Sequence, residues 1–177
     1  MKLEDLINSQ LTNLAHIKRY SAMPVLHVQT VAEHSFYVAT WAYHIALDLQ
    51  RKGFDVNPHL AATKGLLHDN EEALTGDVVY ATKNATLELK HELEQFAQDQ
   101  MTDLSQAIHD QQFRRYFEDW ARAKDDTSPE GRIVDFADRL DVIVYAREEI
   151  KSGNRRAVVL LRQALMHMKC YKDDLML

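Results

Sequence analysis

The chain has 177 residues with a formal net charge of −6, and 46% of the residues are hydrophobic, which predicts one domain, residues 1–177, with a buried core. The negative charge argues against broad nucleic-acid binding, because nucleic-acid surfaces require a basic partner. A membrane protein is also not expected, because no apolar run approaches ~18 residues and no signal-peptide core is present. The single cysteine, Cys170, excludes an internal disulfide and indicates the cytoplasm.

Few helix breakers interrupt the sequence, which holds only 5 Gly and 3 Pro and is rich in Leu, Ala, Glu, Lys and Gln. This composition predicts an all-α fold of six or seven helices without strands. The first helix is expected over residues 3–19 and is followed by an irregular segment, residues 20–29. A second helix is expected over residues 30–52, ending at Gly53.

Asn57 followed by Pro58 is typical of a helix start, with a capping side chain and then proline at the first helical position. We expect this third helix to end near Asp69. A turn follows at residues 75–77, and then a long amphipathic helix at residues 86–108. The residues expected to face inward from this long helix are Leu89, Leu93, Phe96, Ala97, Leu104 and Ile108.

A shorter helix with four aromatic residues (Phe113, Tyr116, Phe117 and Trp120) is expected over residues 112–123. Ser128 and Pro129 form another cap-and-proline start, for a helix that carries Asp138. Gly153-Asn154 breaks the pattern before a final helix that reaches about Tyr171.

The dipeptide His68-Asp69 lies at the end of the third predicted helix. Adjacent side chains on a helix point about 100° apart, so the two cannot share one core environment. An isolated pair of this kind is usually a buried histidine beside a solvent-facing aspartate. Both side chains can instead bind one ion that lies beside the last helical turn.

The positions of His34 and Asp138 favour the interpretation that His68 and Asp69 bind an ion. His34 falls on the buried stripe of the second helix, and Asp138 is flanked by apolar residues on its own helix. Burying an ionised aspartate is costly unless it is paired or bound to a metal. Together with His68 and Asp69 they make a set of two histidines and two carboxylates. Such a set suits a divalent first-row ion that keeps positions open for water or substrate.

These residues resemble the HD-domain phosphohydrolases, whose signature is His, then His-Asp, then a distant Asp. The likeness is greatest to the small 5′-deoxynucleotidases of that superfamily. The matching features are the first His within Glu-His-Ser (residues 33–35), an acidic residue and Leu-Thr-Gly-Asp after His-Asp (residues 72 and 74–77), Ala-Asp at residues 137–138, and Arg-Tyr at residues 19–20. The resemblance covers residues 14–155 and implies an HD-domain helical bundle.

The resemblance implies one divalent ion per subunit (Mn, Co, Mg, Zn or Ni), bound by His34, His68, Asp69 and Asp138. Relatives with two metals use two further histidines before the last aspartate. The residues in that interval here, His91 and His109, lie off the apolar stripe and are expected to face solvent. We therefore expect a single metal ion.

The resemblance also implies roles around the metal. Glu72 is expected to transfer protons, with Glu71 as the rival by sequence. Arg19 and Lys83 are expected to bind phosphate, and Asp77 is expected to accept a hydrogen bond from the sugar 3′-hydroxyl.

Two departures from the family pattern concern the substrate. Tyr20 stands where relatives carry Trp, a residue associated with excluding the ribose 2′-hydroxyl, so a weaker preference for deoxyribose is expected. Asp135 stands where relatives often carry Lys. The loss of this cation reduces the positive field that would attract a phosphate tail, unless Arg132 or Arg139 compensates.

The sequence leaves several functions open. The first is a 5′-deoxynucleotidase acting on deoxynucleoside monophosphates, and the second is a triphosphohydrolase similar to the phage enzymes that remove dATP. A third is a helical binding protein with an inactive site, disfavoured because every ligand position is intact. A fourth, an HD-fold oxygenase, would need the second metal. Relatives form dimers or higher rings, so a homo-oligomer (dimer or hexamer) is expected.

Overall fold

The structure is a computed structural model of the chain, and it describes residue 4, residues 10–112, residues 114–115 and residues 127–175. Within these residues the fold is all-α, as predicted, and the β-type pairing is an isolated bridge between Lys18 and Thr30. The helices are η1 (Leu11–Ala15), α2 (Val31–Arg51), α3 (Pro58–Leu67), α4 (Glu72–Thr75), α5 (Tyr80–Lys83), α6 (Leu87–Ala107), α8 (Pro129–Lys151) and α9 (Ala157–Leu175).

Three helices begin where the sequence predicts, because a side chain caps each of them. Thr30 and Glu33 form a reciprocal capping box at the start of α2. Asn57 caps α3 by accepting from two backbone N–H groups, and Ser128 caps α8 by accepting from that of Gly131. Each of these last two caps is followed by proline, which has no N–H to leave unpaired.

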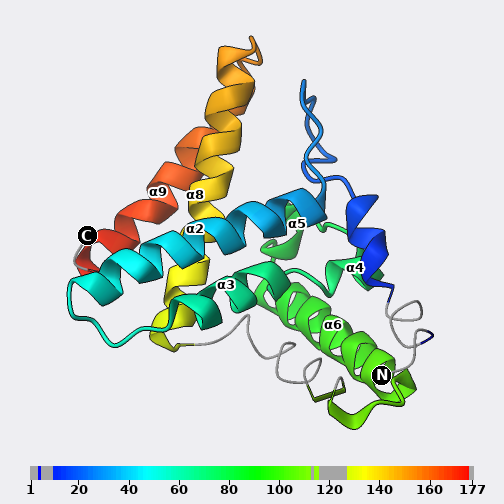
Figure 1. Cartoon of the computed structure of the whole chain (residues 1–177). Helices are drawn as coiled ribbons and strands as arrows, with labels where there is room; N and C mark the ends of the chain where they lie inside the picture. Colours follow the sequence, from blue (N-terminus) through cyan, green and yellow to red (C-terminus); the bar gives the residue numbers. More distant parts are fainter. Residues whose placement is uncertain (1–3, 5–9, 113, 116–126, 176–177) are drawn as a thin grey trace.

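Helices α2, α3 and α8 enclose the main core, and α9 lies along α8 as an antiparallel neighbour (Figure 1). The buried side chains of this core are Val38, Ala42, Ala46, Leu49, Val56, Ala61, Ile133, Val134 and Ala137. A second cluster joins the C-terminal part of α6 to the end of α3 through Met101, Leu104, Ile108 and Leu67. The end of α3 is thereby held between two apolar clusters.

Gly65 allows α2 and α3 to approach closely. A Cβ atom at this position would lie 3.0 Å from Cα of Ala39 and 3.1 Å from its backbone nitrogen. Because both neighbours are backbone atoms of α2, they cannot move aside as a flexible side chain would. The close approach brings His34 of α2 next to His68, the residue that follows α3.

Some predicted elements differ from the structure. The helix expected over residues 3–19 is wrong beyond Ala15, because the N–H groups of Arg19 and Val31 bind the carbonyls of Gln29 and Ile17 and pair the two segments. Phe96 is 51% exposed, not inward, since the buried residues that α6 gives to the second cluster, Met101, Leu104 and Ile108, all lie at its C-terminal end.

The other boundaries are close to prediction. The third helix ends at Leu67, and the turn at residues 75–77 overlaps the short helix α4, with Gly76 at a φ of 74°. The last helix runs past Tyr171. The predicted helix at 112–123 falls mostly outside the described residues. In the part of the chain that the structure describes, every helix is too short or too polar to cross a bilayer.

Candidate metal centre

Four predicted ligand residues come together from α2, the end of α3 and α8. Ligand atoms of His34, His68 and Asp69 all lie within 4.8 Å of one another. Nε2 of His34 lies 3.2 Å from Oδ1 of Asp138 and 3.5 Å from Oδ2 of Asp69. Nε2 of His68 lies 3.1 Å from the same Asp69 oxygen. The two imidazole nitrogens and the two carboxylates thus converge on one point inside the helical bundle.

Hydrogen bonds orient both imidazole rings toward this point. Nδ1 of His34 lies 2.7 Å from Oδ2 of the buried Asp141, and Nδ1 of His68 lies 2.8 Å from the Gly65 carbonyl oxygen. Both of these oxygens are acceptors, so each Nδ1 carries the proton and donates it. The deprotonated Nε2 atoms then point into the cluster, which is the tautomer that a metal ligand requires. The donor set therefore fits a divalent first-row ion.

The electrostatic surroundings keep Asp138 ionised. Burial alone would raise the pKa of this carboxyl group. When no ion is bound and Nε2 of each imidazole carries a proton, the hydrogen bond from His34 and the positive charges of His34, His68 and Arg19 lower the pKa well below its usual range. Arg139 adds a further cation, with Nη1 3.6 Å from Asp138 and Nη2 3.3 Å from Asp135. Arg139 is therefore shared between the two carboxylates.

Arg19 reaches the cluster from the segment before α2. Its Nη1 atom lies 3.5 Å from Oδ2 of Asp69, and its side chain is 13% exposed. Burial alone would lower the pKa of Arg19, but the negative groups around it, among them Asp138, Asp69 and Glu72, raise the pKa above its ordinary value. The predicted proton carrier Glu72 thus lies within electrostatic reach of Arg19, at the first position of α4.

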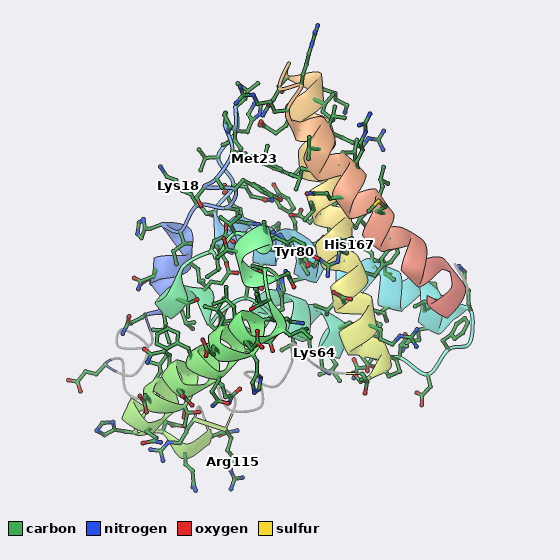
Figure 2. All side chains as sticks on the ribbon, turned by 180° about the vertical axis from the view of Figure 1, so that it is seen from behind. Lys18, Met23, Lys64, Tyr80, Arg115 and His167 are labelled. Atoms are coloured by element: carbon green, nitrogen blue, oxygen red, sulfur yellow. The ribbon has the colours of Figure 1, made fainter. Side chains whose placement is uncertain are left out.

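The predicted sugar-binding residues Tyr20 and Asp77 are also brought together. The backbone N–H of Tyr20 donates to Oδ2 of Asp77 at 3.2 Å, which joins the segment before α2 to the loop after α4. Lys83 closes the short helix α5, where its side chain is half-buried. Tyr80 of the same helix contacts the His167 ring of α9, with ring centroids 5.6 Å apart (Figure 2).

Two polar residues behind the cluster, Asp141 and Gln29, were not predicted from the sequence. Asp141 is 2% exposed and accepts from the side chain of Gln29 at 2.9 Å as well as from His34. A carboxylate that holds a histidine ligand by its second nitrogen fixes the ring and raises its basicity. The available signal was the spacing, because Asp141 lies one helical turn beyond Asp138 and shares its face of α8.

The remaining histidines form no comparable group among the described residues. His91 and His109 are exposed, as predicted, and neither joins the ligand cluster. The described side chains therefore provide one metal site.

A family model for YfbR-like 5′-deoxynucleotidases matches residues 8–173, nearly the whole chain. The chain belongs to the YfbR-like 5′-deoxynucleotidase family. A 5′-deoxynucleotidase of Photorhabdus laumondii is 30% identical to this YfbR-like chain over 151 residues, covering 82% of the chain and 74% of the relative. A 5′-deoxynucleotidase of Klebsiella pneumoniae is 31% identical over 150 residues, covering 82% and 73%.

Solved structures support the same fold for this YfbR-like protein. An HD-domain phosphohydrolase from Listeria innocua superposes with a TM-score of 0.86 at 25% identity, covering 98% of this chain and 82% of that one. The HD phosphohydrolase of cyanophage S-2L, solved with dA and one catalytic Zn²⁺ ion, has a TM-score of 0.66 at 19% identity over 93% and 83% of the chains. The resemblance to HD-domain phosphohydrolases, and the enzyme class it implies, are confirmed.

Proposed function

We propose that the protein is a 5′-deoxynucleotidase, which releases inorganic phosphate from deoxynucleoside 5′-monophosphates with the help of a divalent metal ion. The observation that carries this proposal is the convergence of His34, His68 and Asp69, joined by Asp138, in a chain of the YfbR-like family. The Photorhabdus and Klebsiella relatives are named for this activity.

We assign metal binding to His34, His68, Asp69 and Asp138. When bound, a divalent ion supplies a Lewis acid that makes water a better nucleophile and offsets the charge of the phosphate. Asp141 and the Gly65 carbonyl hold the two imidazole rings in the orientation that this role needs.

Hydrolysis joins a water oxygen to phosphorus and breaks the bond between phosphorus and O5′ of the sugar. The attacking water loses a proton and O5′ gains one. We assign this proton transfer to the Glu72 carboxylate, because the N–H of Glu72 binds the Asp69 carbonyl at 3.0 Å and keeps the residue beside the cluster. Arg19, 3.5 Å from Asp69, would neutralise a phosphate oxygen, and Lys83 is assigned to the phosphate by family analogy.

We assign sugar recognition to Asp77 and Tyr20. The contact between the Tyr20 N–H and Asp77 supports this assignment, since it joins Asp77 to the segment whose Arg19 reaches Asp69 of the cluster. A carboxylate has further lone pairs, so Asp77 can accept from a sugar 3′-hydroxyl while it keeps the Tyr20 contact.

Three further expectations complete the proposal. Residues 1–177 form one domain, and the protein works in the cytoplasm, in agreement with its single cysteine.

The protein is a homo-oligomer, either a dimer or a hexamer. Exposed apolar side chains such as Phe36, Val159 and Met166, each more than 60% exposed, support a surface that another subunit covers. Light scattering during size-exclusion chromatography tests the assembly.

The experiment that tests the activity is a hydrolysis screen of the full-length protein. Deoxy- and ribonucleoside mono- and triphosphates are incubated with Mn²⁺, Co²⁺ or Mg²⁺, and the products are separated by anion-exchange chromatography. We expect orthophosphate from deoxynucleoside monophosphates, and no turnover by the Asp69→Asn variant prepared in parallel. Tripolyphosphate from dATP, with no orthophosphate from dAMP, would overturn the proposal in favour of a triphosphohydrolase.

A further inference from the structure

One face of α8 holds the segment that carries Arg19 and Tyr20. Asp141, Tyr145 and Glu149 recur every four residues on this face, and they are 2%, 9% and 0% exposed. Each of them contacts the loop of residues 19–29, whose ends are joined by the bond from the Arg19 N–H to the Gln29 carbonyl. The loop rises beside the C-terminal half of α8 (Figure 1). We call Tyr145 and Glu149 the loop seat.

Glu149 fixes the far end of the loop. Its carboxylate accepts from the backbone N–H groups of Leu26 at 2.8 Å and His27 at 2.7 Å, and from Nδ2 of Asn154 at 2.6 Å. The same Asn154 nitrogen also donates to the carbonyl of Pro24 at 2.9 Å. A fully buried carboxylate with this many donors is ordered, because each donor would be left unpaired if the loop moved away.

Tyr145 contacts the loop at both His27 and Tyr20. Its hydroxyl donates to the His27 carbonyl at 2.6 Å. Its ring stacks on the ring of Tyr20, with centroids 4.5 Å apart and planes 13° from parallel. The orientation of the Tyr20 ring therefore depends on a side chain that lies outside the ligand cluster.

Tyr20 has features that persist only when the surroundings fix them. Its φ is 61°, a left-handed conformation that is strained for a tyrosine, and its buried hydroxyl has no hydrogen-bond partner among the described residues. Its N–H binds Asp77 at 3.2 Å. Stacking on Tyr145 and the bond to Asp77 together hold this conformation.

We propose that Tyr145 and Glu149 are positioning residues for substrate selectivity: they hold the loop so that the Tyr20 ring and the Asp77 carboxylate present one fixed surface to the sugar of the nucleotide. This inference rests on the proposed deoxynucleotidase function. Loss of the loop seat raises KM and weakens the preference for deoxyribose. The metal and the kcat for bound substrate are retained, because the imidazole ligands are oriented by Asp141 and the Gly65 carbonyl, and Arg19 has its own contact with Asp69 at 3.5 Å.

The kinetic test compares Tyr145→Leu with Tyr145→Phe. The Leu variant removes the stacked ring, and we expect KM for dAMP to rise by about 3- to 10-fold, on the scale of one stacked aromatic pair. The ratio of kcat/KM for dAMP to that for AMP falls, whereas kcat and bound metal stay near wild type. The Phe variant keeps the ring and restores most of both values. Val144→Leu, at an exposed position next to Tyr145, is the matched control.

A second measurement does not depend on turnover. Hydrogen exchange of residues 19–29 is compared in Glu149→Gln and Glu148→Gln, since Glu148 is the exposed neighbour paired with Lys151. We expect faster exchange at the amides of Leu26 and His27 in Glu149→Gln, together with the same rise in KM for dAMP. Glu148→Gln behaves as wild type.

Faster exchange with an unchanged KM and dAMP/AMP ratio would overturn the proposal, because the loop would then be held without affecting selectivity. A fall in bound metal that matches the loss of kcat would overturn it as well. An inactive wild-type protein would instead remove the proposed function, whereas the exchange data and the equilibrium binding of dAMP would still test the loop seat.

Discussion

Helix α8 carries two buried carboxylates, Asp138 and Glu149, whose surroundings differ in kind. Asp138 faces groups that themselves titrate or carry charge, namely His34, His68 and two arginines. Glu149 accepts from two backbone N–H groups and the Asn154 amide, and the imidazole that contacts it, that of His27 at 3.0 Å, is 63% exposed rather than buried. The pKa of each carboxyl group is lowered. The buried imidazoles beside Asp138 can release their protons and bind an ion, whereas the amide groups around Glu149 hold the loop in place. Burial and a lowered pKa alone therefore do not identify a ligand.

The largest effect is expected at the shared ligand of the cluster. Asp69→Asn should abolish metal binding and hydrolysis, because Oδ2 of Asp69 faces both imidazoles and a neutral amide is a poorer ligand than a carboxylate. Metal analysis and a phosphate-release assay measure the two losses, and circular dichroism checks that the helices remain. Turnover like that of the wild type would remove Asp69 from the metal site.

Replacing Glu72 is expected to impair proton transfer without affecting metal binding. Glu72→Ala should lower kcat by about 10²–10⁴-fold, the usual scale for losing a general acid or base. Its metal content should stay near wild type. Glu71→Ala is the matched control, and if it were the damaging change the assignment would belong to Glu71.

A smaller effect is expected one turn beyond Asp138. Asp141→Asn should weaken metal affinity by about 10- to 100-fold, because His34 loses the charged acceptor that orients its ring. Asp135→Asn is the control, since Asp135 lies on the same helix with 45% of its side chain exposed and pairs with Arg139. Competition with a chelator measures both affinities. Equal affinities would mean that the Asp141 charge does not act on the metal.

The smallest effect is expected on stability at the loop seat. Burial would raise the pKa of Glu149, but hydrogen bonds from Asn154, Leu26 and His27 lower it to about 2, from an ordinary 4.5. A depressed folded-state pKa adds stability above pH 4.5 that is lost as the pH falls toward 2. Glu149→Gln should lower the free energy of unfolding at pH 7 by about 1–3 kcal/mol.

The gap between wild type and Glu149→Gln should narrow between pH 4.5 and pH 2, as measured by urea denaturation at several pH values. A gap of constant size over that range would show that the Glu149 charge contributes nothing. Glu148→Gln should differ little from wild type at any pH, because the Glu148 side chain is 59% exposed.

The helix starts at Thr30, Asn57 and Ser128 were predictable because each cap is a local interaction between residues that are close in the sequence. His34 and Asp138 were predictable from helical spacing, since a polar side chain on a buried stripe requires a partner. The assignment of catalytic roles stays a prediction until the variants are measured.

The irregular segment at residues 20–29 was predicted, but the conformation of the loop was not, because it depends on α8, far along the chain. The same reason explains why the predicted helix was wrong beyond Ala15, where local helix propensity was overridden by the pairing of Arg19 with Gln29. The spacing from Asp138 placed Asp141 on the same face of α8, but its orienting role could not be predicted, since a tertiary hydrogen bond to His34 has no signature in the neighbouring residues.

Gly65 limits how this enzyme can be stabilised by engineering. Replacing a helical glycine with alanine is a common route to a more stable protein, with a gain of up to about 1 kcal/mol from helix propensity. At this position the added methyl group would meet the backbone of Ala39 at 3.0 Å, so it would force α2 and α3 apart. The distance between the His34 and His68 rings, 5.1 Å between centroids, would widen with the helices. We therefore expect Gly65→Ala, chosen for the stability of α3 alone, to lower the affinity of the site for its metal ion.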